Sequence, residues 1–202
     1  MTPPDERAAE PAPEPARRED APALEPAIAR QVEALAEAAA AALAPHESGG
    51  SRRANLVEEM MRTALRTLSD SVDLGQLKVM ERALREMRSG YRVFNRYKGV
   101  RKISIFGSAR TPEDHPDYRA ASEFGALMAA EGWMAITGAG LGIMKAGHEG
   151  PQREASFGLS IRLPFETNAN EIIKGDPKLV NFRYFFTRKL MFVSHSDAVA
   201  CF

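Results

Sequence analysis

Two glycine-containing segments carry the spacing in this chain that most suggests ligand chemistry. Gly138-Ala-Gly-Leu-Gly142 follows a short apolar stretch and precedes a helical pattern, and Gly107-Ser108 follows another apolar stretch. Glycines at a strand-to-helix turn let backbone N–H groups approach a phosphate closely, and the N-terminus of the following helix adds a partial positive charge. The spacing is typical of a phosphate or ribose site, although glycines needed only for a tight turn give the same pattern.

The longer glycine segment differs from both common phosphate-binding motifs. A dinucleotide fingerprint has a third glycine three residues after the second, where this chain has Ile143, and an acidic residue ending the next strand, where Leu163-Pro164 stands. The dinucleotide fingerprint also follows the first strand of its unit, whereas the segment that begins at Gly138 follows the second predicted strand. A Walker A motif requires Gly-Lys-Ser or Gly-Lys-Thr, which the segment lacks. The segment alone leaves the ligand class open.

Strand and helix patterns alternate from Arg101 onward. The apolar stretches predict four strands, at Lys102–Phe106, Trp133–Thr137, Phe157–Leu163 and from Asp197, with helices over Tyr118–Glu131, from Ile143, and over Phe182–His195. This alternation predicts an α/β fold, a Rossmann-like parallel sheet with crossover helices. In such sheets ligands bind beyond the carboxyl ends of the strands, where Gly107–Arg110, Gly138–Gly142 and Pro164–Asn170 would lie.

The chain divides into three segments by composition. Residues 1–50 form a disordered, Pro-, Ala- and acid-rich extension with a marginal helix over residues 28–44 and a linker at His46–Ser51. Residues 51–98 form an amphipathic helical segment with predicted helices over 52–69 and 73–93, from which we expect at least a homodimer. Residues 99–202 form the front part of the Rossmann-like domain. Because Phe202 stands in an apolar strand with nothing to cover it, we expect more chain after it.

Charge and composition narrow the function classes. The chain has 27 basic and 27 acidic residues; the first 50 residues hold four Arg and ten acidic residues. The small basic excess in residues 51–202 suits a small anionic ligand at least as well as a polyanion. The sequence has no stripe of basic residues with interleaved aromatics, so it does not predict nucleic-acid binding. One cysteine allows no intrachain disulfide, and no apolar stretch is long enough to cross a membrane. We expect a cytoplasmic protein.

Four segments, in order, resemble the long-form LOG family of enzymes, often labelled lysine decarboxylase-like. They are Phe106-Gly-Ser-Ala-Arg110, Thr137-Gly-Ala-Gly-Leu-Gly-Ile-Met144, Leu163-Pro-Phe-Glu166 and Thr187-Arg-Lys-Leu-Met191. The resemblance covers residues 101–202. It implies hydrolysis of the N-glycosidic bond of nucleoside 5′-monophosphates, of the AMP or cytokinin riboside monophosphate type, to free base and ribose 5-phosphate. It implies no cofactor and no metal.

The resemblance also assigns roles to individual residues. Arg188 matches the family's catalytic arginine. The residues that match substrate-binding positions are Gly107, Ser108, Gly138, Gly140, Gly142, Glu166 and Lys189. Without the resemblance, Arg188 and Lys189 would be interpreted as surface charges and Glu166 as part of a turn. The family's Pro-Gly-Gly-x-Gly-Thr loop and its catalytic Glu would follow Phe202, so we expect this chain alone to be inactive.

An arginine and a carboxylate suit this chemistry. Cleavage of an N-glycosidic bond builds positive charge on the ribose ring, which a carboxylate stabilises, while a guanidinium holds substrate oxygens. The alternative is a Rossmann-like carrier that binds a nucleotide or cofactor without cleaving it. A DNA-processing protein is disfavoured by the charge pattern, and pyridoxal phosphate-dependent decarboxylation has no sequence support.

The remaining candidate residues are assigned no chemistry. His115, His148 and His195 lack the spacing of metal ligands. Cys201 is expected to be buried. The aromatic residues Phe182, Phe185, Phe186 and Phe192 are expected to lie in the core.

Overall fold

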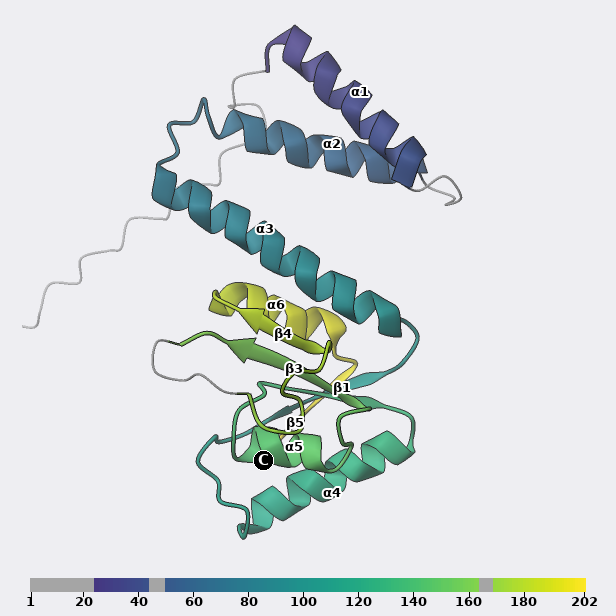
Figure 1. The fold of residues 1–202 in the computed structure, drawn as a ribbon, viewed down its shortest axis with the longest axis vertical. Coiled ribbons are helices and arrows are strands. Elements are labelled where there is room, and N and C mark those ends of the chain that lie inside the picture. The colour runs from purple at the N-terminus through teal and green to yellow at the C-terminus, as the bar shows by residue number, and fades with distance from the viewer. Residues whose placement is uncertain (1–23, 44–49, 164–168) are drawn as a thin grey trace, which may run out of the picture. The chain divides into compact units, whose positions relative to one another are not determined.

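The computed structural model describes residues 24–43, 50–163 and 169–202, which form two compact units (Figure 1). One unit is Met1–Leu77 and the other is Lys78–Phe202. Most of the extension predicted to be disordered, and most of the predicted linker, lie outside the described residues. Gly50 and Ser51 are the exception in that linker, since they belong to a helix.

The first unit contains a pair of packed helices, α1 (Pro26–Leu43) and α2 (Gly50–Arg66). Small and β-branched side chains make their contact: Val32 and Ala36 on α1 and Ala54 on α2 are buried. The guanidinium of Arg62 pairs with Glu58 one turn earlier and donates a hydrogen bond to the carbonyl of Ala29 on α1, at 3.2 Å. Both helices were predicted, with boundaries shifted by one to three residues.

The next helix, α3 (Leu74–Phe94), begins at a capping box and continues into a short 3-10 helix, η1 (Asn95–Tyr97). The N–H of Gln76 donates to the carboxylate of Asp73, and the N–H of Asp73 donates to the side chain of Gln76. This reciprocal arrangement satisfies two backbone donors that a helix start leaves free. The residues of α3 that are buried share one face by their spacing: Ala83, Glu86, Gly90 and Phe94.

Five parallel strands form the sheet of the second unit. They are β1 (Lys102–Phe106), β2 (Met134–Thr137), β3 (Ser156–Ile161), β4 (Leu179–Phe182) and β5 (Ala198–Cys201), in the order β4-β3-β2-β1-β5. The connecting helices are α4 (Pro116–Ala130), α5 (Ile143–Glu149) and α6 (Phe185–His195). The predicted α/β fold with a Rossmann-like parallel sheet is confirmed.

One strand was not predicted from the sequence. The helix expected over 182–195 begins only at Phe185, and Leu179–Phe182 forms β4 instead. Four residues between polar loops give too short a pattern, and the aromatics on both sides of Arg183-Tyr184 looked like one helix. Phe182 and Phe192 are buried as expected, but Phe185 and Phe186 are 53% and 54% exposed.

The expectation of a buried Cys201 is also wrong. Its strand, β5, lies at the edge of the sheet and, within the described residues, pairs with β1 alone. Exposure alternates along β5, so Val199 and Cys201 are exposed while Ala198 and Ala200 are partly buried. A strand with neighbours on one side and a half-covered face exposes every second side chain.

Helices lie on both faces of the sheet (Figure 1). α4 and α5 lie on one face, and α6 lies on the other beside the part of α3 that belongs to this unit. Two apolar clusters result. Ile105, Tyr118 and Ile143 belong to the cluster on the α4 and α5 side, and Phe157, Phe182 and Met191 to the cluster on the other. None of the helices in the described part of the chain is long and apolar enough to span a membrane.

Phe157 is central to the larger cluster, since its ring is fully buried, stacks on Phe94 at 4.6 Å and meets Tyr97 edge-on at 5.1 Å. We predict that Phe157→Ala lowers the free energy of unfolding by about 3–5 kcal/mol, because it leaves a cavity among residues that cannot all move in. Urea denaturation of the full chain measures this. Leu127→Ala, at a side chain 60% exposed on α4, is the control and should change stability by no more than about 0.5 kcal/mol. Equal losses in both variants would contradict this description of the core.

Candidate functional site

β1 and β2 end at nearly the same level of the sheet, and β3 continues three residues farther, from Gly158 to Ile161. The register pairs Ser104 of β1 with Ile136 of β2, and Thr137 of β2 with Gly158 of β3. If this register is continued by one to three residues, the segments after β1 and β2 lie side by side. The first segment begins at Gly107 and the second at Gly138. The chain builds β1 to β4 outward and then returns to place β5 beside β1, so the strand order reverses at β1. Open α/β sheets bind ligands at the carboxyl ends beside such a reversal.

The two glycine segments contact each other. Gly142 has φ 59° and ψ −134°, and a Cβ there would lie 2.3 Å from the carbonyl oxygen of Ser108. A Cβ on Gly107 would lie 2.6 Å from the side chain of Ile143. Both positions therefore require glycine, as a close approach of two loops demands. The N–H of Ile143, the first residue of α5, donates to the carbonyl of Ser108 at 3.0 Å, so the protein itself uses this donor.

A buried hydrogen-bond network holds the longer glycine segment from below. The Thr137 hydroxyl accepts the N–H of Ala139 at 3.0 Å, and the side-chain amide of Asn170 donates to the carbonyl of Gly140 at 2.9 Å. The backbone N–H of Asn170 donates to the carbonyl of Ala139 at 2.8 Å. Ala139 has φ 65°, a conformation rare for residues with a side chain, and these bonds on both sides stabilise it.

His148 joins the two ends of this network. Its Nε2 lies 3.0 Å from the carbonyl of Phe157 and 3.0 Å from the Thr137 hydroxyl, and its Nδ1 lies 3.2 Å from the amide nitrogen of Asn170. Because a carbonyl can only accept, Nε2 carries the proton and Nδ1 accepts from Asn170. The ring is fully buried, and burial lowers its pKa, against smaller opposing effects from Phe157 and Asn170. His148 is a neutral structural residue.

Arg188 reaches the same edge from α6. Its Nε donates to the carbonyl of Leu159 on β3 at 2.7 Å, and one terminal nitrogen, Nη2, lies 3.5 Å from the carbonyl of Gly138. A Cβ on Gly138 would lie 2.5 Å from that nitrogen, so glycine makes room for the guanidinium. The group also lies over the ring of Phe192, at 5.4 Å. Burial lowers the pKa of Arg188, but a guanidinium keeps its charge at any physiological pH.

The structure brings most of the expected site residues together. Gly107 and Ser108 contact the segment that contains Gly142, and Gly138, in the same segment, contacts Arg188. Lys189 is exposed on α6, next to Arg188 in the sequence, without a hydrogen bond or ion pair to any residue in the described ranges. Glu166 lies outside the described residues. Arg188 and both glycine segments therefore share one rim of the sheet, the carboxyl edge.

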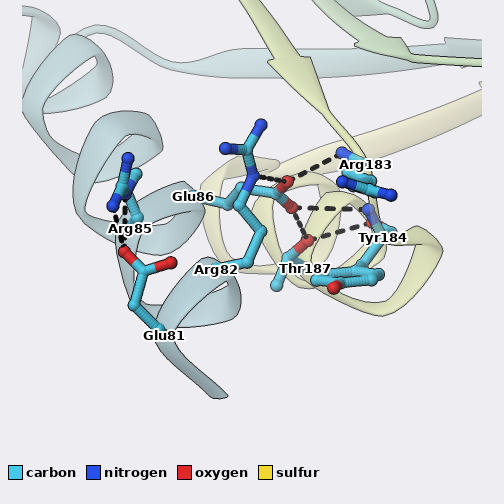
Figure 2. A network of polar contacts seen from close by, with 7 residues as sticks. All are labelled: Glu81, Arg82, Arg85, Glu86, Arg183, Tyr184 and Thr187. Carbon is cyan, nitrogen blue, oxygen red and sulfur yellow. Dashed lines mark hydrogen bonds and ion pairs between the residues drawn. The ribbon is translucent and has the colours of Figure 1, made fainter. Parts of the chain in front are cut away.

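A carboxylate that the sequence did not single out supports the start of α6 (Figure 2). Glu86 of α3 accepts hydrogen bonds from the N–H of Arg183 at 2.8 Å and the Thr187 hydroxyl at 2.7 Å. Its other two donors are Tyr184 N–H and Arg82 Nε. Burial alone would raise the pKa of Glu86, but these bonds outweigh burial and hold it below its ordinary value.

Sequence reasoning missed Glu86, Asn170 and the structural role of His148 for a shared reason. Each contacts residues of other structural elements, and Glu86 lies 97 to 101 positions from Arg183 and Thr187. No local pattern of residue types signals such a contact. Thr137 was available as a signal, because a hydroxyl directly before the glycine segment can accept one of its N–H groups.

The described side chains contain no cluster of metal-ligating residues. In residues 24–43, 50–163 and 169–202, no three His, Cys, Asp or Glu residues gather closely enough to hold a metal ion. Lys145 on α5 instead pairs with Glu113 at 2.6 Å and with Glu171 at 2.9 Å, and these bonds raise the pKa of Lys145. That cluster is an ion-pair network with its own cation.

The buried histidine gives a testable pH dependence. We predict that the His148 ring stays neutral, with the proton on Nε2, as the pH falls below about 6.5, the ordinary pKa of histidine. Unfolded chains take up that proton and the folded protein does not, so stability falls as the pH drops below about 6.5, by at most about 1.4 kcal/mol per pH unit for this group. Two-dimensional ¹⁵N NMR of the ring measures tautomer and charge. A His148 ring that protonates at or above pH 6.5 would contradict the assignment.

The part of the chain that forms this sheet matches a known protein family. A family model described as the SLOG cluster4 family (LDcluster4) matches residues 100–200. A comparison with curated proteins gave no match. Among solved structures, the molybdenum cofactor carrier protein MCP from Chlamydomonas reinhardtii is similar at 20% identity and a TM-score of 0.39, over 50% of this chain and 61% of that one. The chain thus spans less than two thirds of that structure. Since the family model covers half of its residues, this chain belongs to the SLOG cluster4 family.

Proposed function

We propose that the carboxyl edge binds a nucleoside 5′-monophosphate, and that the full-length gene product hydrolyses its N-glycosidic bond to free base and ribose 5-phosphate. Membership of the SLOG cluster4 family and the four segments that resemble the LOG family support this reading. The place of Arg188 among the glycine segments supports it independently of the resemblance.

The observation that carries the proposal is that the Arg188 guanidinium is held in place without a carboxylate partner among the described residues. Its guanidinium is partly buried and held in place by two carbonyl oxygens, which use two of its five N–H groups. No carboxylate among the described residues lies within ion-pair distance of it. A fixed and unneutralised guanidinium beside tight glycine turns can donate hydrogen bonds to an anionic oxygen ligand.

The chemistry follows from where charge develops. As the bond between base and ribose breaks, positive charge builds on the ring and negative charge on the departing base. Arg188 can hold substrate oxygens at a constant position, while a carboxylate beside the ring stabilises the cation. Glu166, which our resemblance places at the substrate, lies outside the described residues, and the family's catalytic Glu matches no position in these 202 residues.

The second candidate is a carrier that binds a nucleotide or nucleotide-bearing cofactor without cleaving it. The same observation favours it: the described residues provide a cation and no partner carboxylate near it. Such a site binds an anion but gives no stabilisation to a cationic ring in the transition state, and binding without differential stabilisation does not accelerate a reaction.

One experiment separates the two candidates. The full-length gene product is incubated with AMP, and chromatography measures adenine and ribose 5-phosphate while calorimetry measures binding. Release of both products in equal amounts supports hydrolysis. Saturable binding of AMP with no release supports the carrier, and neither binding nor release would contradict both.

Arg188 is the residue to test by mutation. We predict that Arg188→Ala weakens AMP binding by roughly tenfold or more, because a charge-assisted, two-point contact is lost. Arg188→Lys should bind with intermediate affinity, since lysine keeps the charge but not the planar fork.

The control is Arg101→Ala, at an exposed position directly before β1 and therefore at the opposite, amino end of the strands. Calorimetry with AMP is the measurement for all three variants. Equal affinities in the wild type and Arg188→Ala, both correctly folded, would remove Arg188 from the site.

A further inference from the structure

We propose that Glu86 is a positioning residue for Arg188: from α3, it fixes the first turn of α6 and so the place of the guanidinium at the carboxyl edge. The functional consequence rests on the proposed function, while the placement of Arg188 can be tested without any ligand.

Helix α6 lacks a cap of its own. Its N-cap residue, Tyr184, makes no side-chain capping bond, and its first turn has no acidic residue. The first N–H groups of a helix have no partner within the helix and must find acceptors elsewhere. The carboxylate of Glu86 accepts one of them, the N–H of the N-cap residue Tyr184, together with the N–H of Arg183 just before the helix (Figure 2).

Glu86 also bonds to the residue directly before Arg188. The Thr187 hydroxyl lies 2.7 Å from Oε2 of Glu86 and 2.9 Å from the carbonyl of Tyr184. Thr187 itself is fully buried, so few alternative partners exist for its hydroxyl. The carboxylate therefore determines both where α6 begins and how its first turn is rotated.

A second contact lies one turn farther along both helices. A Cβ on Gly90 of α3 would lie 2.5 Å from the sulfur of Met191 on α6, so the two helices touch there. Thr187 and Met191 are four residues apart, and Arg188 follows the first of them. The backbone that carries Arg188 is thus held between a polar contact at Glu86 and a steric contact at Gly90.

The carboxylate is suited to this position because it is charged. Glu86 is 5% exposed, and its two oxygens accept bonds from four groups on two helices and a loop. A negative charge near the start of a helix also complements the positive end of its dipole. A glutamine would offer one acceptor oxygen in place of two and would present an amide N–H to donors.

The test compares Glu86→Gln with Glu81→Gln in the full chain. Glu81 lies on the same helix and pairs with Arg85 at the exposed surface, so it undergoes the same chemical change away from α6 (Figure 2). The direct readout is the Arg188 Nε–H signal in ¹⁵N NMR, which reports its bond to the carbonyl of Leu159. The functional readout is AMP affinity.

We expect Glu86→Gln to shift the Arg188 signal, speed its hydrogen exchange and weaken AMP binding by roughly five- to tenfold. Glu81→Gln should change neither. Glu86→Asp, which keeps the charge on a shorter side chain, should recover part of both. If Glu86→Gln does not fold, Thr187→Val is used, since it removes only the hydroxyl and should give a smaller change in the same direction.

The outcomes separate the two proposals. An unchanged Arg188 signal in the folded Glu86→Gln variant, or in Thr187→Val if that variant is used, would overturn the positioning role. A changed signal in a protein that does not bind AMP even as wild type would uphold that role and overturn the proposed ligand instead.

Discussion

The parallel register of β1, β2 and β3 is the constraint on which the rest of the site depends. Because Ser104 pairs with Ile136 and Thr137 with Gly158, the segments that follow β1 and β2 emerge side by side, next to Leu159 of β3. Parallel pairing fixes both the direction and the level at which each strand ends. A shift of this register would separate Gly107 from Ile143 and take the carbonyls that hold Arg188 away from its guanidinium.

Polar groups below and beside the edge complete what the register begins. Thr137, His148 and Asn170 form a buried network that satisfies the backbone of the glycine segment. Glu86 does the same for the two residues that lead into α6. In both places a buried polar side chain bonds to backbone groups that would otherwise have no partner, which costs far more in a protein interior than at the surface. The functional side chains are therefore placed by residues that contact no ligand themselves.

The sequence predicted the parts of this arrangement that have a local pattern. The three helices before the sheet, four of its strands and the glycine turns follow from periodicity and from glycine at strand ends, and the structure has them within a few residues. β4 was missed because four residues give too little periodicity to separate a strand from the aromatic helix that follows. Cys201 was expected to be buried because an apolar strand was assumed to be covered on both faces, which does not hold for an edge strand.

The site was less accessible to sequence reasoning than the fold. Arg188 could be named only through a resemblance, since Arg-Lys on a helix is ordinarily a surface pair. Glu86 and Asn170 act across about a hundred and about thirty residues respectively, and several of their partners are backbone groups, which leave no signature in residue types.

The most direct test of the account is to map AMP on the protein by NMR. If the ligand binds at the carboxyl edge, the Arg188 Nε–H and the backbone amides of Gly107, Gly138 and Gly140 should shift together on titration with AMP, with one shared dissociation constant. Saturable shifts confined to other parts of the chain, with these four signals unmoved, would contradict the central claim that this edge is the nucleotide site.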